Sequence, residues 1–119
     1  MTLNFSVNTL NSSASTQRTV ALGGLLANTN YLVCARFKSG QKMDFQILNK
    51  ALSAEKTTDM GDPADLGAKL RIGGSYQADL TNAGIHRFSA LHTVALTDGE
   101  ITKAATQWTA WAKAVGLTI

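Results

Sequence analysis

Apolar and polar side chains alternate at the start of the chain. Leu3, Phe5 and Val7 are each separated by a polar residue, the period-two pattern of a half-buried β-strand. Small polar residues then occupy positions 11–16, which predicts a surface loop. A second short strand is expected at residues 19–22. This part of the chain is therefore predicted to be β-structure.

Residues 31–38 carry the clearest strand pattern, and residues 43–49 are the expected antiparallel partner. Each of these two strands has one apolar face. The two apolar faces lie on the same side of the sheet only if the numbers of paired residues sum to an even value, which excludes a two-residue turn. A three-residue loop over 39–41 or 40–42, with Gly40 at positive φ, satisfies this condition. The apolar set is Val33, Ala35, Phe37, Met43, Phe45 and Ile47, and the opposite, mixed polar face holds Cys34, Arg36, Lys38, Asp44, Gln46 and Leu48.

Residues 84–101 read as a strand that stops at a helix start. Thr97 and Glu100 have the spacing of a capping box, in which each side chain satisfies a backbone N–H at the helix N-terminus. A helix is expected over about residues 98–115, with Gly116 as its left-handed C-terminal cap. Trp108 and Trp111 lie three apart on its apolar stripe, so we expect this face to pack on a sheet or on a partner.

Length and charge limit the classes of function. A chain of 119 residues with 45% hydrophobic residues is expected to form a single domain, residues 1–119. The net charge is +3, but the eleven Lys and Arg residues are spread along the chain, so nucleic-acid binding is not expected. No stretch approaches the ~20 apolar residues of a membrane span, and the first residues lack a signal-peptide pattern. No membrane insertion is expected, and assembly in the cytoplasm is favoured. The single Cys34 excludes an intrachain disulfide and is expected to be a buried thiol.

Several short motifs together resemble a known family. They are LRIGG at residues 70–74, Gly84-Ile85, and ALTDGEI at residues 95–101, preceded by the hairpin pattern of residues 30–50. This series resembles the later half of concanavalin A-like or laminin G-like jelly-roll domains, over residues 30–101. The resemblance implies a mainly β fold, a short antiparallel β-sandwich or reduced jelly roll with a C-terminal helix. Full family members are about twice as long, so fewer strands are expected here.

Two loops hold candidate ligand-binding residues. Asp59, Asp62 and Asp65 lie three apart and could supply oxygen ligands to calcium, although a solvated acidic turn is favoured. In the loop of residues 72–82, Tyr76 could stack on a sugar ring while Asp79 and Asn82 form hydrogen bonds. A plain loop between strands is the favoured alternative. The phosphate-loop interpretation fails because no helix follows the glycines.

Catalysis is not expected, and no cofactor is implied. His86 and His92 would share one face of a strand but lie ~20 Å apart, too far to bind one ion together. The paired carboxylates of the glycoside hydrolases that use the resembled fold are missing.

Two functions from different classes therefore remain. The favoured hypothesis is a non-enzymatic structural or attachment module, such as a phage head-decoration or tail protein, assembled in the host cytoplasm into the virion. Its partners would be further copies of the chain or other virion proteins, with Trp108 and Trp111 at the interface. Otherwise the protein is expected in the cytoplasm or outside the cell. The alternative is a carbohydrate-binding, lectin-like module that recognises a glycan.

Overall fold

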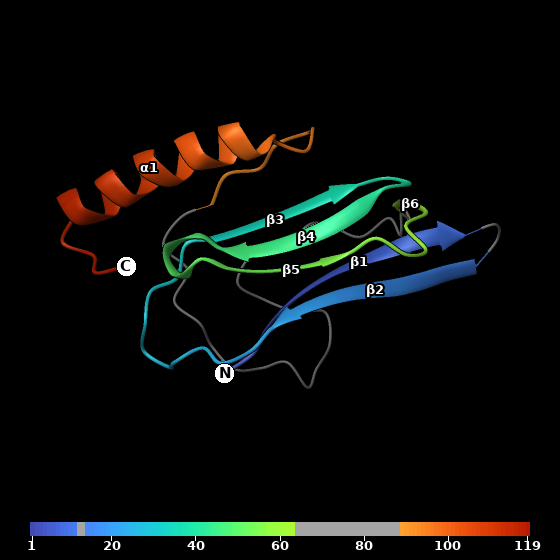
Figure 1. Ribbon diagram of the computed structural model, residues 1–119, viewed down its shortest axis with the longest axis horizontal. Helices are drawn as coiled ribbons and strands as arrows, with labels where there is room; N and C mark the ends of the chain where they lie inside the picture. Colours follow the sequence, from blue (N-terminus) through green and yellow to red (C-terminus); the bar gives the residue numbers. More distant parts are fainter. Residues whose placement is uncertain (12–13, 64–88) are drawn as a thin grey trace.

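The computed structural model describes residues 1–11, 14–63 and 89–119 (Figure 1). These residues form two three-stranded antiparallel sheets and one long helix at the C-terminal end. The predicted mainly β class with a C-terminal helix is thereby confirmed.

The first sheet is built around a long hairpin of β1 (Leu3–Asn11) and β2 (Ala14–Leu22), with the two-residue strand β6 (Asp62–Pro63) on the other side of β1. The predicted loop over 11–16 is wrong, because the strands leave only positions 12 and 13 between them. Hydroxyl groups support the pairing: the hydroxyls of Ser6 and Thr19 are 2.8 Å apart, and Thr9 Oγ1 donates to the Thr16 carbonyl at 3.4 Å. Threonine suits a pleated sheet surface, so a polar composition did not prevent a strand here.

The second sheet begins with the hairpin of β3 (Val33–Lys38) and β4 (Lys42–Ile47). Lys38 pairs with Lys42, so the loop has three residues, 39–41, and Gly40 takes a φ of 66°. The even-sum register and one of the two predicted loops are confirmed. Within the described part of this sheet β3 is an edge strand. This explains why Val33 is exposed while Met43, Phe45 and Ile47 on β4 are buried.

The strand predicted to run to residue 49 ends earlier, at Ile47, and is followed by the 3-10 helix η1 (Leu48–Lys50). Asn49 explains the change of direction, because its Oδ1 accepts a hydrogen bond from the Leu32 N–H at 2.9 Å and its Nδ2 donates to the Asn30 carbonyl at 3.1 Å. Ala51, at a φ of 50°, then reverses the chain into β5 (Leu52–Lys56), a strand that the sequence pattern did not indicate.

A shared core joins the two sheets. The buried cluster contains β2 residues, β4 residues and two residues from connecting segments: Val20, Leu22, Leu25, Met43, Phe45, Ile47 and Met60. The rings of Phe5 on β1 and Phe45 on β4 are 6.1 Å apart. The predicted apolar face of β4 is therefore the face that packs against the first sheet.

The sequence predicted a strand directly before the helix, and this prediction is wrong for the residues of that strand that the structure describes. Residues 89–97 form no strand, and Leu91 and Val94 are exposed. Their alternation with polar residues resembles a strand, but neither apolar side chain packs into a core. The rest of that predicted strand, residues 84–88, lies outside the described residues.

The predicted helix is confirmed as α1 (Asp98–Ala114), including its capping box. Gly116, at a φ of 76°, ends the helix as predicted, and the Leu117 N–H donates to the Ala112 carbonyl at 2.8 Å. In Figure 1, α1 lies over one face of β3–β4–β5 and the β1–β2 hairpin lies on the other side. Among the described residues, no helix has the length and apolar character needed to cross a membrane.

Candidate functional site

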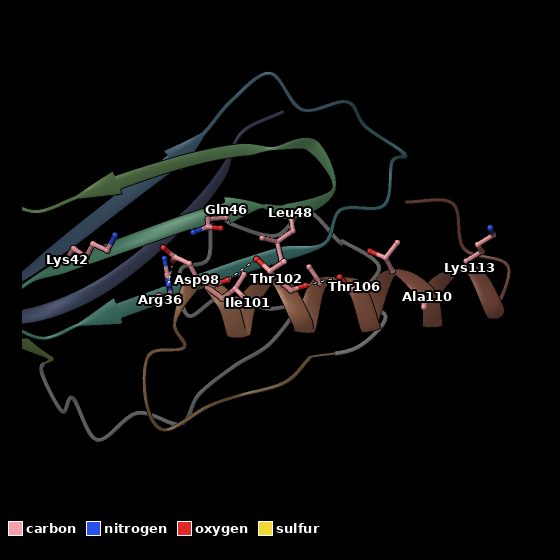
Figure 2. Close-up of a pocket in the computed structure, with 12 residues that line it drawn as sticks. Arg36, Lys42, Gln46, Leu48, Asp98, Ile101, Thr102, Thr106, Ala110 and Lys113 are labelled. Atoms are coloured by element: carbon pink, nitrogen blue, oxygen red, sulfur yellow. Dashed lines mark hydrogen bonds and ion pairs between the residues drawn. The ribbon is translucent and has the colours of Figure 1, made fainter.

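An open groove of about 730 Å³ separates α1 from the outer face of β3–β4–β5, the face away from the core (Figure 2). The sheet lines it with Arg36, Lys42 and Gln46, and η1 adds Leu48. The helix lines it with one flank, on which residues recur every three or four positions, from Asp98 through Thr102, Thr106 and Thr109 to Lys113. The groove is thus the space between the helix and the polar face of the sheet.

Arg36 occupies the end of the groove nearest the helix start. Its Nε donates to both carboxylate oxygens of Asp44, at 2.9 and 3.0 Å. Its Nη1 donates to the Leu96 carbonyl at 2.8 Å and lies 2.7 Å from Asp98 Oδ1. One guanidinium therefore connects β3, β4 and the N-terminus of α1.

Burial matters for this cluster, because the Arg36 and Asp44 side chains are only 11% and 5% exposed. Burial by itself would lower the pKa of Arg36, but the hydrogen bonds to Asp44 and then Asp98 outweigh it and the pKa is raised. Arg36 therefore remains a cation, and buried Asp44 retains its partner.

A second ion pair extends the cluster along β4 and β5. Lys42 Nζ lies 3.2 Å from Glu55 Oε2 and 3.8 Å from Asp44 Oδ2, and Gln46 Nε2 donates to Asp44 Oδ1 at 3.0 Å. These charges face one another across paired strands, since Asp44 is the register partner of both Arg36 and Glu55.

Two threonines on the helix flank, Thr102 and Thr106, already use their hydroxyl hydrogens. Thr102 Oγ1 donates to the Asp98 carbonyl at 2.9 Å, and Thr106 Oγ1 donates to the Thr102 carbonyl at 3.0 Å. Both hydroxyls therefore present oxygen lone pairs to the groove.

Cys34 lies on the same face of β3 as Arg36 and is half-buried rather than buried as predicted. Burial raises the pKa of its thiol, Arg36 acts in the opposite direction, and Asp44 raises the pKa further. The thiol is thus held in its neutral, weakly nucleophilic form.

The apolar stripe of α1 is only partly covered. Ile101 and Ala112 are buried and Trp108 is half-buried, whereas Trp111 is 38% exposed and Val115 is 53% exposed. The two indoles pack edge to face with ring centroids 6.1 Å apart. At 100° per residue, Trp111 and Val115 lie on the helix flank opposite to the groove.

The three carboxylates considered as calcium ligands have other partners where they are described. Asp59 forms an ion pair with Arg18 at 3.8 Å, and Asp62 accepts a hydrogen bond from the Ser39 hydroxyl. Asp65 lies outside the described residues, and no metal-ligating group of three His, Cys, Asp or Glu residues gathers in the described part of the chain.

Other predicted positions fall outside the description or apart from the groove. Tyr76, Asp79 and Asn82, the predicted sugar-binding residues, lie outside the described residues, as does His86. His92 is exposed in the segment before α1. The structure therefore brings together residues that were not among the candidates: Arg36, Asp44 and Asp98.

The sequence contained a signal for part of this cluster. Once the 39–41 loop is chosen, Arg36 falls directly opposite Asp44, and opposite charges at paired positions attract across strands. No pattern in the sequence indicated that Asp98 at the helix start would reach the same guanidinium.

The chain was compared with family models, curated proteins and solved structures, and none of them matches significantly.

Proposed function

We propose that this protein is a non-enzymatic structural or attachment module of a larger assembly, such as a phage head-decoration or tail protein, built as a reduced concanavalin A-like β-sandwich. The observation that carries this proposal is the apolar surface formed by Trp111 on α1 and by Val115 directly after the helix, which are 38% and 53% exposed. Its partners are further copies of the chain or other proteins of the virion.

Exposed tryptophan surface favours an interface for two reasons. Each Å² of apolar surface removed from water contributes roughly 25 cal/mol, so covering an indole and its neighbours is favourable. Trp111 also packs against Trp108, so little side-chain freedom is lost on binding. Tryptophan is enriched among the residues that dominate binding energies.

The groove supports a structural rather than a chemical role. Arg36 binds both Asp44 and Asp98, and Lys42 pairs with Glu55. These contacts hold the strands and the helix together. The thiol of Cys34 is kept neutral by burial.

The glycan hypothesis has no equivalent support. Tyr76, Asp79 and Asn82 lie outside the described residues, and none of the described residues that line the groove has an aromatic side chain on which a sugar ring could stack.

The test is self-association measured by sedimentation across protein concentrations. Wild-type chain should form larger species, and Val115→Lys should shift it toward monomer. Leu26→Lys is the matched control, because Leu26 is also an exposed apolar residue but belongs to the segment between β2 and β3. A wild-type chain that stays monomeric and also fails to associate with virus-like particles contradicts the proposal.

A further inference from the structure

The middle of the groove between α1 and the sheet is lined by hydrogen-bond acceptors. Thr102 and Thr106 donate their hydroxyl hydrogens to helix carbonyls at 2.9 and 3.0 Å, so their oxygens can only accept further hydrogen bonds. On the facing sheet, Gln46 Nε2 donates to Asp44 Oδ1 at 3.0 Å, which leaves Gln46 Oε1 as another acceptor. This part of the groove therefore suits a ligand that carries N–H donors.

The charge of the lining favours an anionic group at one end of the groove. Among the described residues that line it, Arg36, Lys42 and Lys113 are cations and Asp98 is the carboxylate. Arg36 and Lys42 already pair with carboxylates of the sheet. Lys113, in the last turn of α1, forms no ion pair with any residue that the structure describes. Its ammonium is therefore available to a carboxylate of a ligand.

The spacing of these groups matches an extended peptide. Residues four apart on a helix, such as Thr102 and Thr106, are separated by ~6 Å along its axis. The N–H groups on one side of an extended chain recur at every second residue, or about every 6.6 Å. From Thr102 to Lys113 the helix rises ~16.5 Å, the length of about five extended residues. A peptide can therefore reach both threonines and place its C-terminal carboxylate at Lys113.

We propose that the groove binds the C-terminal segment of another polypeptide in an extended conformation. Alternate backbone N–H groups of the segment donate to Thr102 and Thr106, and its terminal carboxylate pairs with Lys113. Binding requires no movement of α1, because the groove is open along this flank of the helix (Figure 2). The site does not depend on the proposed assembly, which rests on Trp111 and Val115 on the opposite flank.

The probe is a pooled library of random hexapeptides with free C-terminal carboxylates, selected on the intact chain and identified by mass spectrometry. Fluorescence anisotropy then gives the Kd of the most enriched peptide with a free and with an amidated C-terminus. Amidation should weaken binding by roughly two- to fivefold, the range for one exposed ion pair. In Lys113→Gln the two forms should bind equally. Lys103→Gln is the matched control, because Lys103 is exposed on the same helix but does not line the groove; it should retain the preference for the carboxylate.

N-methylation of one peptide residue at a time tests the hydrogen bonds to the threonines. Binding should weaken at alternate positions by roughly two- to tenfold, the range for one neutral hydrogen bond, and one of these positions should lose its sensitivity in Thr106→Ala. The proposal is overturned if no hexapeptide is enriched, if Lys113→Gln keeps the preference for the carboxylate, or if the effect of N-methylation does not alternate. Binding of an oligogalacturonate that depends on Lys113, with no peptide bound, would also overturn it and assign the groove to an acidic glycan.

Discussion

At the scale of single residues, Arg36 shows why an arginine suits this position. A guanidinium carries its donors in a rigid fork, so one side chain can satisfy several acceptors in fixed directions. Here Nε binds Asp44 while Nη1 binds the Leu96 carbonyl and Asp98. A lysine has one ammonium nitrogen and could not reach these acceptors from two nitrogens at once.

Asp44→Ala should lower the free energy of unfolding by about 3 kcal/mol, the low end for breaking a buried ion pair, because Arg36 keeps Asp98 as a second partner. Urea denaturation measures the change. Glu55→Gln removes an exposed carboxylate from Lys42 and should cost less than about 1 kcal/mol. Equal effects of the two substitutions would show that the Arg36–Asp44 pair is no more important than a surface contact.

Glu100 gives a pH-dependent prediction. Hydrogen bonds from the Thr97 backbone N–H and then its hydroxyl lower the pKa of the Glu100 carboxyl. A lowered pKa means that the stabilisation is fully present above the unfolded-state pKa of about 4.3 and is lost as pH falls through the folded-state value. An NMR titration should show Glu100 titrating below this reference in wild type. In Thr97→Ala its pKa should move part of the way back, since the backbone donor remains; identical titration curves for the two chains would contradict this account.

At the scale of elements, local rules predicted α1 and the β3–β4 hairpin well. A capping box, a glycine stop and a period-3.6 stripe are all short-range signals, and each is present in the structure. The hairpin register followed from the requirement that Met43, Phe45 and Ile47 share a face with their partners across the turn.

The remaining elements depended on contacts that local patterns do not encode. Residues 14–16 look like a loop but pair with β1, and Leu52–Lys56 forms a strand because β4 offers it hydrogen bonds. Conversely, residues 91–96 look like a strand but form none, and Leu91 and Val94 are exposed. The groove was not predictable for the same reason, since it lies between the sheet and α1, which meet through the long-range contact of Arg36 with Asp98.

Thr97→Ala should cost about 1 kcal/mol of stability by leaving a helix-start N–H unsatisfied. Thr106→Ala is the matched control within the same helix. It removes an exposed mid-helix threonine and should leave the stability unchanged or raise it by roughly a few tenths of a kcal/mol. Denaturant midpoints compare the two. An unchanged midpoint for Thr97→Ala would mean that the capping box contributes nothing to folding.

At the scale of the whole molecule, the two sheets depend on one shared set of apolar side chains. Met43 and Ile47 are fully buried on β4, and Phe45 between them meets Phe5 from the other sheet. The outer face of β4 is polar and lies toward the groove. A single strand thus separates the core from the candidate site, so the packing of β4 also sets the position of Asp44.

Phe45→Ala should therefore lower the free energy of unfolding by about 3–5 kcal/mol, the usual cost of removing a buried aromatic side chain. Val33→Ala on the same face should cost less than about 1 kcal/mol, because Val33 is exposed at the edge strand. A double-mutant cycle with Phe5→Ala isolates the contact between the sheets, and a coupling of about 0.5–1.5 kcal/mol is expected for an aromatic pair. Additive effects of the two substitutions would show that the sheets are not joined through these rings, and a small effect of Phe45→Ala alone would place the core elsewhere.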